Sequence, residues 1–131
     1  MTDQQDTRPT MTRPWADIVS HYQCRVEGGM DIGAMLRLVE QIEASSYARG
    51  LYAWTSMHDL CIVQVPGVDA YEGHHLRISP RFDGTIEFRY IDTPNREKQW
   101  HRVVKEEDAF QRLERFIDQL HWVVREKKRD V

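Results

Sequence analysis

The feature that most constrains this fold is a change in hydrophobic period at Gly50. Before Gly50 the apolar residues recur at helical spacing, whereas from Leu51 to about Lys105 they occur in short alternating, β-branched or aromatic runs. Links rich in Gly, Pro, Asn and Asp separate these runs. Because strands joined by short links pair antiparallel, this part of the chain predicts an antiparallel sheet of four to five strands.

Two helices are expected ahead of the sheet. The first starts at Pro14, which suits a first helical turn, and stops at the pair Gly28-Gly29. The second covers about 31–48, with Asp31 as its N-cap and a single apolar stripe behind it. A third helix is expected after the sheet, at about 106–125, where apolar residues step by three and four.

The predicted fold is therefore a single α+β domain of order α-α-β-β-β-β-β-α, with the helices packed on one face of the sheet. A chain of 131 residues with 40% hydrophobic and 30% charged side chains fits one ordinary globular core. We expect a disordered segment at 1–13, the folded domain at 14–126 and a basic tail at 127–131. In the third helix, Asp108 and Gln111 have the spacing of a capping box.

Residues 76–90 predict a hairpin, and the alternation of apolar and polar residues along its two strands predicts its register. A loop of Phe82, Asp83 and Gly84 would pair Ile78 with Phe88, so that apolar residues of both strands share one face. Gly84 would then take the left-handed position of a three-residue loop, where a glycine has no Cβ to clash. Pro80 cannot donate to a ladder, which predicts an edge strand or a bulge there.

The same register sends a row of polar side chains to the other face. Arg77 would lie directly opposite Arg89, with Arg81 at the start of the loop, and like charges in such a pair repel. Guanidinium groups bind carboxylates and phosphates through forked hydrogen bonds, so the three arginines are the candidate binding site. A solvated face, or pairing with acidic neighbours, is the alternative interpretation of these arginines.

Trp122 is the fourth candidate binding residue. It falls off the apolar stripe of the last helix, beside Arg115 and Gln119 on a helical wheel, and is therefore expected to be exposed. Exposed Trp is common at protein contacts.

The chain has no motif for catalysis, a cofactor or a metal. The histidines and cysteines lack zinc-ligand spacing, and no nucleophile elbow, P-loop or dinucleotide-binding pattern occurs. Adjacent His74 and His75 would point to opposite faces of a strand. The favoured hypothesis is a non-catalytic binding or adaptor protein. The alternative is a ligand-binding domain or enzyme with a pocket between sheet and helices that uses His58, Cys61 or His101.

The partner expected from this composition is a protein with an acidic surface, or an anionic ligand. The net charge of −3, from 18 basic and 21 acidic residues, gives no general attraction to nucleic acid or anionic membranes. Two distant cysteines without a secretion signal or a membrane-length apolar run predict a cytoplasmic protein with free thiols. A homodimer through a strand edge or the C-terminal helix is also expected.

Overall fold

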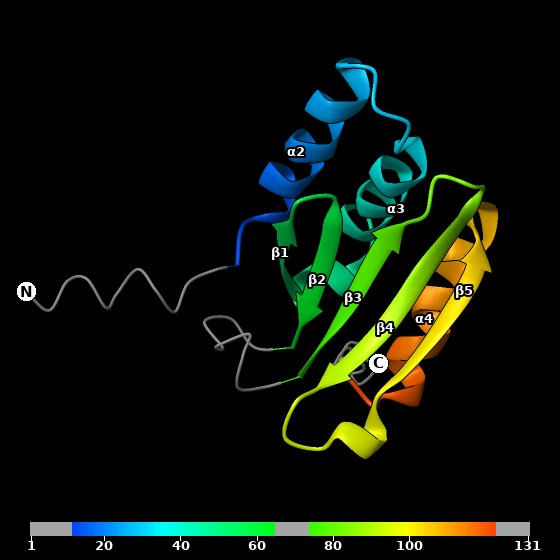
Figure 1. Ribbon diagram of the computed structural model, residues 1–131. Helices are drawn as coiled ribbons and strands as arrows, with labels where there is room; N and C mark the ends of the chain where they lie inside the picture. Colours follow the sequence, from blue (N-terminus) through cyan, green and yellow to red (C-terminus); the bar gives the residue numbers. More distant parts are fainter. Residues whose placement is uncertain (1–11, 65–73, 123–131) are drawn as a thin grey trace, which may run out of the picture.

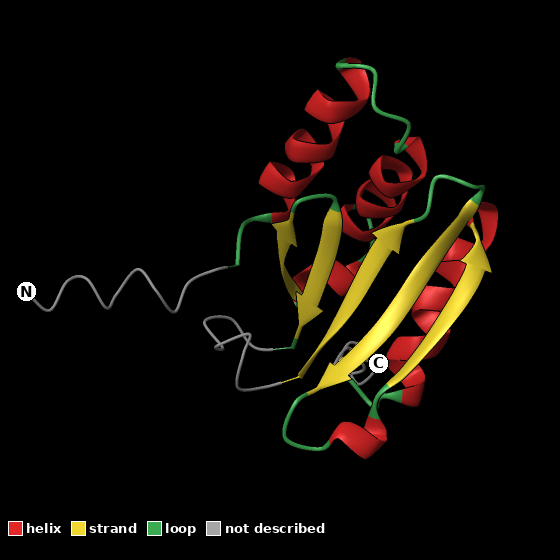
Figure 2. Ribbon diagram, viewed as in Figure 1, coloured by secondary structure: helices red, strands yellow, loops and turns green. Residues whose placement is uncertain are grey.

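The computed structural model describes residues 12–64 and 74–122, which form one α+β domain (Figure 1, Figure 2). Three α-helices and five strands follow the predicted order. The helices are α2 (Trp15–Glu27), α3 (Gly33–Glu43) and α4 (Ala109–Gln119), and the strands are β1 (Tyr52–Ser56), β2 (Asp59–Val63), β3 (His74–Pro80), β4 (Thr85–Asp92) and β5 (Trp100–Lys105). Short 3₁₀ turns η1 (Ser46–Arg49), η2 (Arg96–Lys98) and η3 (Glu106–Asp108) join them.

The sheet is an antiparallel meander in which each strand pairs with its neighbours in sequence, in the order β1-β2-β3-β4-β5. Helices α3 and α4 lie behind this sheet in Figure 1, and α2 lies beside α3 at one end.

The core forms between the sheet and the helices. Its sheet side is lined by Leu60, Ile62, Leu76, Ile78, Ile86 and Phe88, all fully buried. Each such side chain contributes ~1.5–3 kcal/mol to folding through its burial. The opposite face of the sheet has no helix over it in the described residues, and we call it the open face (Figure 1).

Helix α2 is joined to the sheet by two hydrogen bonds from its aromatic side chains. Nε1 of Trp15 donates to the carbonyl oxygen of Leu51 at 3.0 Å, and the hydroxyl of Tyr22 donates to the carbonyl oxygen of His58 at 2.9 Å. The helix ends as predicted, because Gly29 takes φ +100° and lets the chain reverse. These contacts fix α2 against β1 and the turn that follows it.

Helix α3 is shorter than predicted at both ends. It begins at Gly33 with Ile32 at the N-cap position, so the expected cap by Asp31 is wrong. It ends at Glu43 rather than near residue 48, because the hydroxyl of Ser45 donates to the carbonyl oxygen of Ile42 and accepts from the amide of Tyr47. Serine side chains that bond nearby backbone compete with helical hydrogen bonds in this way.

The last helix also differs from the prediction. The turn η3 occupies its expected start, and Asp108 makes no side-chain cap bond, so the capping box is wrong. The helix stops at Gln119 instead of residue 125. His121 adopts φ 60°, and the amide of Trp122 donates to the carbonyl oxygen of Ile117 at 3.1 Å. This is a Schellman ending with histidine where glycine is usual.

Pro80 is not on an edge strand, contrary to one expectation, because β3 is the central strand of the sheet. It is the last residue of β3 and pairs with Ile86 of β4. In the antiparallel ladder the nitrogen of Pro80 points toward β2, but the position beside it belongs to the β1–β2 turn and not to β2. The missing donor therefore removes no ladder hydrogen bond.

The expected disordered segment at 1–13 and the basic tail at 127–131 lie almost wholly outside the described residues. Thr12 and Arg13 are the exceptions, and the amide of Arg13 donates to the carbonyl oxygen of Ala53 at 2.8 Å in an isolated bridge on the outer side of β1. The described part of the domain therefore begins before Pro14.

Candidate binding site on the open face of the sheet

The β3–β4 hairpin has the register that the alternation of apolar and polar residues predicted. Ile78 pairs with Phe88, and Arg77 pairs with Arg89. Phe82, Asp83 and Gly84 form the loop, with Gly84 at φ +88°. Apolar partners therefore face the helices, and the two arginines lie side by side on the open face.

Asp59 brings a negative charge to this arginine pair. Its Oδ2 lies 2.7 Å from Nε of Arg77 and 3.7 Å from Nη2 of Arg89, so one carboxylate is shared between two guanidinium groups. Asp59 is the first residue of β2, and strand alternation sends its side chain to the same face as Cys61. The sequence analysis missed this contact because it depends on the β2–β3 register.

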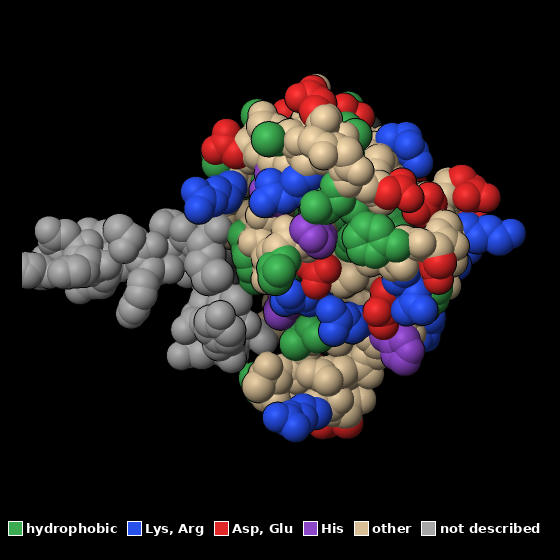
Figure 3. Space-filling view, turned by 45° about the horizontal axis from the view of Figure 1, so that its top comes forward, with side chains coloured by type: hydrophobic (Ala, Val, Ile, Leu, Met, Phe, Trp, Pro, Cys, Tyr) green, Lys and Arg blue, Asp and Glu red, His purple; other side chains and the backbone are tan. Residues whose placement is uncertain are grey.

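Arg81 is balanced separately, at the loop. Its guanidinium lies 3.8 Å from carboxylate oxygens of both Asp83 and Glu87. The carboxylate of Asp83 also accepts hydrogen bonds from the amide and hydroxyl of Thr85, and the hydroxyl is the main reason that the pKa of Asp83 is lowered. Positive and negative side chains are accordingly interspersed on the tilted view of this surface (Figure 3).

A single cross-strand row runs through the arginine pair and spans the whole sheet. Its members are paired in register from β1 to β5: Trp54, Cys61, Arg77, Arg89 and His101. The β1–β2 end is apolar, since Trp54, Cys61 and Val63 form a small buried cluster. The β4–β5 end is cationic and more exposed. The row therefore passes from a buried apolar cluster at one end to exposed basic side chains at the other.

His75 lies on the open face beside the apolar end of this row. Its ring is 5.5 Å from the ring of Trp54, and the side chain is only 7% exposed. Burial, and then the charges of Arg77 and Arg89, lower the pKa of His75 to about 4. Neither ring nitrogen has a hydrogen-bond partner among the described residues. At neutral pH His75 is therefore uncharged, and its ring lies against the buried apolar cluster of Trp54, Cys61 and Val63.

A shallow cavity of about 330 Å³ opens at the cationic end of the row. It is lined by Arg89, Tyr90, Ile91, Arg96, Gln99, Trp100 and His101. The lining includes two arginines and a histidine but no acidic residue. Nε of Arg89 is buried without a hydrogen-bond partner in the described structure. The cavity therefore has a basic lining that suits an anionic group.

The three residues proposed for an alternative pocket are not brought together. His58 lies in the β1–β2 turn, Cys61 in β2 and His101 in β5, with two strands between the last two. Cys61 and His101 are on the open face rather than between sheet and helices. Burial raises the pKa of the Cys61 thiol to about 11, so this thiol is protonated and weakly nucleophilic at neutral pH.

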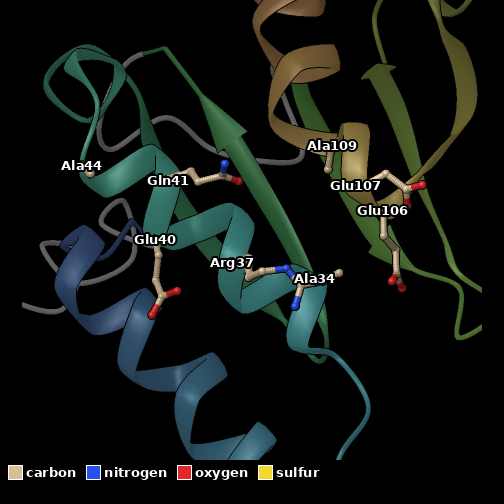
Figure 4. A pocket seen from close by; sticks show the side chains of 8 residues that line it. All are labelled: Ala34, Arg37, Glu40, Gln41, Ala44, Glu106, Glu107 and Ala109. Carbon is tan, nitrogen blue, oxygen red and sulfur yellow. The ribbon is translucent and has the colours of Figure 1, made fainter.

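A second cavity, of about 470 Å³, lies between α3 and the start of α4 (Figure 4). Arg37 and Glu40 line it from α3, and Glu106 and Glu107 line it from η3, so three carboxylates and one guanidinium surround the cavity. Three alanines, Ala34, Ala44 and Ala109, leave the space between the helices open. Sequence reasoning did not identify this cavity, and its lining holds no histidine, cysteine or aromatic side chain.

The expectation that Trp122 is an exposed contact residue is wrong. Trp122 is 3% exposed, belongs to the main core and lies 6.3 Å from the ring of His74. The helical wheel does not apply to it because α4 has already ended, and the reversal at His121 returns the chain to the core. Trp122 is therefore removed from the candidate binding residues.

Adjacent His74 and His75 point to opposite faces of β3, as predicted, with His74 beside Tyr90 and His75 beside Trp54. Across residues 12–64 and 74–122, no group of three or more His, Cys, Asp or Glu side chains is arranged to hold a metal ion. Within the same ranges, no helix is long and apolar enough to cross a membrane.

Comparison with known proteins gives no relative. No protein-family model, curated protein or solved structure matches this chain.

Proposed function

We propose that this chain is a non-catalytic binding module that engages an acidic protein surface or an anionic ligand through the open face of its sheet. The observation that supports this most directly is the sharing of Asp59 between Arg77 and Arg89. Asp59 supplies one negative charge to two guanidinium groups, which favours the approach of a further anionic group beside the arginine pair although the chain as a whole has a net charge of −3. An incoming carboxylate or phosphate would relieve the repulsion of the arginine pair.

The cavity beside Arg89 supports the same class of ligand. Arg96 and His101 add cationic or potentially cationic groups to its lining, and no acid opposes them there. Together the arginine pair and this cavity favour a surface interaction in which complementary charge sets the orientation of the partner.

The experiment measures binding of a fluorescent poly-glutamate peptide by anisotropy over a range of salt concentrations. The test variant reverses the three face arginines, Arg77→Glu, Arg81→Glu and Arg89→Glu. The matched control reverses three exposed arginines of α3, η1 and α4, namely Arg37→Glu, Arg49→Glu and Arg115→Glu, and has the same net charge. Circular dichroism and denaturant unfolding establish that both variants are folded.

We expect wild type to bind in a salt-dependent manner, the face variant to lose at least about tenfold in affinity, and the control to lose much less. Equal losses in both variants would mean that only overall charge matters, and the proposed face would be rejected. With a confirmed face, the same pair of variants can be used to capture a natural partner from nuclease-treated lysate.

The alternative of a ligand pocket or enzyme that uses His58, Cys61 or His101 has less support, because these residues lie apart and the Cys61 thiol is protonated. It predicts thermal stabilisation by a metal ion or metabolite that is lost on His-to-Ala substitution. A cytoplasmic location, consistent with the free thiols of Cys24 and Cys61, and a homodimer both remain predictions.

A further inference from the structure

Strand β5 forms one edge of the sheet. The outer side of the other edge strand, β1, is already met by Arg13. Within residues 12–64 and 74–122, no segment pairs with the outer side of β5. Open strand edges are usually blunted by proline, bulges or covering elements, because they can template pairing with another chain. β5 has six residues, no proline and an unbroken register with β4.

The backbone groups that face outward on β5 can be assigned. The amide of Glu106 donates to the carbonyl oxygen of Gly84, which makes Gly84 and Glu106 a hydrogen-bonded pair. Because such pairs alternate along an antiparallel ladder, Val104 and Arg102 also bond β4, whereas His101, Val103 and Lys105 direct their backbone groups outward. The carbonyl oxygen of His101 already accepts a 2.8 Å hydrogen bond from Nη1 of Arg102. Lys105 is the N-cap of η3, so its carbonyl oxygen serves the first bond of that turn. Val103 therefore presents an outward donor and acceptor, and His101 and Lys105 each present an outward amide.

The side chains of β5 give this edge a definite charge. His101, Arg102 and Lys105 are exposed, and the strand contains no acidic residue. Val103 is 48% exposed and offers a β-branched contact between the charges. At the start of the strand, the cavity lined by Arg89 and Arg96 adds further positive charge.

A second copy of this chain is a poor occupant of the edge. Two β5 strands could pair antiparallel about a two-fold axis, with the helices of both copies on the same side of the joint sheet. In a register centred on residue 102, the two Arg102 side chains would lie directly opposite each other. A register centred on residue 103 would oppose His101 and Lys105. Arg102 would repel its copy in the first register, and in neither register would a cation of β5 meet an acidic side chain of the same strand, so the edge does not complement itself.

We propose that β5 accepts an extended acidic segment of a partner protein as a sixth strand of the sheet. Backbone hydrogen bonds with Val103 and Lys105 would supply affinity. Alternate acidic side chains of the segment would lie on the open side of the sheet, the side of His101 and Lys105, and the residues between them would lie on the helix side. The inference deepens the proposed function by naming how the partner attaches, and it rests on that function for the negative charge of the partner.

The test uses ¹⁵N-labelled protein titrated with an acetylated seven-residue peptide of alternating Glu and Val. The matched peptide of alternating Lys and Val is the control. Amide shifts and hydrogen-exchange protection are read separately at the edge, for His101, Val103 and Lys105, and on the face, for Arg77 and Arg89. The protein variants are Val103→Pro, which removes one outward donor, and Val103→Ala, which keeps that donor and shortens the side chain.

We expect the acidic peptide to shift and protect the edge amides, the basic peptide to have no effect, and Val103→Pro to weaken binding about tenfold while Val103→Ala weakens it less. Lys105→Glu, which alters only an exposed side chain, provides a second loss of affinity if Val103→Pro fails to fold. Shifts confined to Arg77 and Arg89, with unchanged binding by Val103→Pro, would overturn the edge inference and leave the proposed function standing. No shift at either place would contradict both. If sedimentation shows a wild-type dimer that Val103→Pro separates into monomers, the occupant is a second copy and the acidic segment is wrong.

Discussion

The carboxylate of Asp59 lies 2.7 Å from Nε of Arg77, and this contact joins the first residue of β2 to the central strand of the sheet. Both side chains are partly buried, at 20% and 28% exposure, so solvent screens the pair less than an ion pair on an open surface. The same carboxylate also reduces the electrostatic repulsion between Arg77 and Arg89. Asp59 therefore stabilises the fold and at the same time offsets the charge that the proposed ligand would meet.

Replacing Asp59 with Asn should consequently have two effects of opposite sign. We expect a loss of about 1–2 kcal/mol in the free energy of unfolding, because a charge-assisted hydrogen bond is weakened and the arginine pair loses its counter-charge. Affinity for the poly-glutamate peptide should rise. Urea denaturation and peptide anisotropy measure the two effects, with Glu43→Gln, an exposed change of the same charge on α3, as the control. A variant that binds the peptide no better than wild type would argue that the arginine pair does not meet the ligand.

His75 should make stability depend on pH in the acidic range. Burial lowers the pKa of His75 from 6.5 to about 4, so the unfolded chain takes up a proton at a pH where the folded chain does not. Above pH 6.5 His75 is unprotonated in both the folded and the unfolded state, so it adds nothing to the pH dependence of stability. As pH falls from 6.5 to about 4, stability should fall by up to about 3 kcal/mol from this group.

The measurement is the free energy of unfolding in urea at a series of pH values for wild type and His75→Phe. The variant keeps a ring against Trp54 and should lose this part of the pH dependence, whereas His101→Gln, at an exposed histidine, should retain it. Parallel curves for wild type and His75→Phe would show that His75 titrates normally in the folded protein.

Tyr22→Phe should destabilise the fold by about 1 kcal/mol. The hydroxyl of Tyr22 donates to the carbonyl oxygen of His58 at 2.9 Å from a fully buried side chain, and no other bond of the described structure satisfies that oxygen. The loss should appear as a lower denaturation midpoint with an unchanged slope. Tyr52→Phe removes a hydroxyl from a half-buried tyrosine of β1 and should have little effect; a comparable loss there would mean that the hydrogen bond is not the cause.

His121→Gly should stabilise the protein by about 0.5–1 kcal/mol. His121 is exposed and has φ 60°, a conformation in which a side chain has a steric cost that glycine avoids. His121→Ala keeps the Cβ and should give no such gain. Thermal unfolding of the three proteins separates the outcomes, and equal midpoints for Gly and Ala would indicate that the backbone at this position is not strained.

The parts of the fold that could be predicted are those fixed by local periodicity. Alternation over residues 76–90, together with one glycine in the loop, determined the β3–β4 register and the Arg77–Arg89 pair. The pairing of β2 with β3 could not be derived in the same way, because the ten residues 64–73 connect them and no turn geometry fixes the register across that length. Asp59, the acidic partner of two candidate arginines, was missed for this reason.

The helix ends were mispredicted for a different physical cause. Ser45 and His121 each end a regular segment through their own side-chain hydrogen bonding or backbone conformation, and apolar spacing carries no information about either. The error at His121 then propagated to Trp122, since a wheel continued past the true helix end gives the wrong face. The β5 edge depends on the complete strand order, which periodicity leaves open.

The meander order has a consequence for the way the chain can fold during synthesis. Each strand pairs with its sequence neighbours, so loop closure is inexpensive and the sheet can grow one strand at a time from β1. β5 and α4 are the last described elements to emerge from the ribosome. Until they arrive, β4 is the growing edge, and the apolar faces of Ile86 and Phe88 lack their final cover. Among the described elements, the last two to be made therefore protect the nascent sheet from premature association.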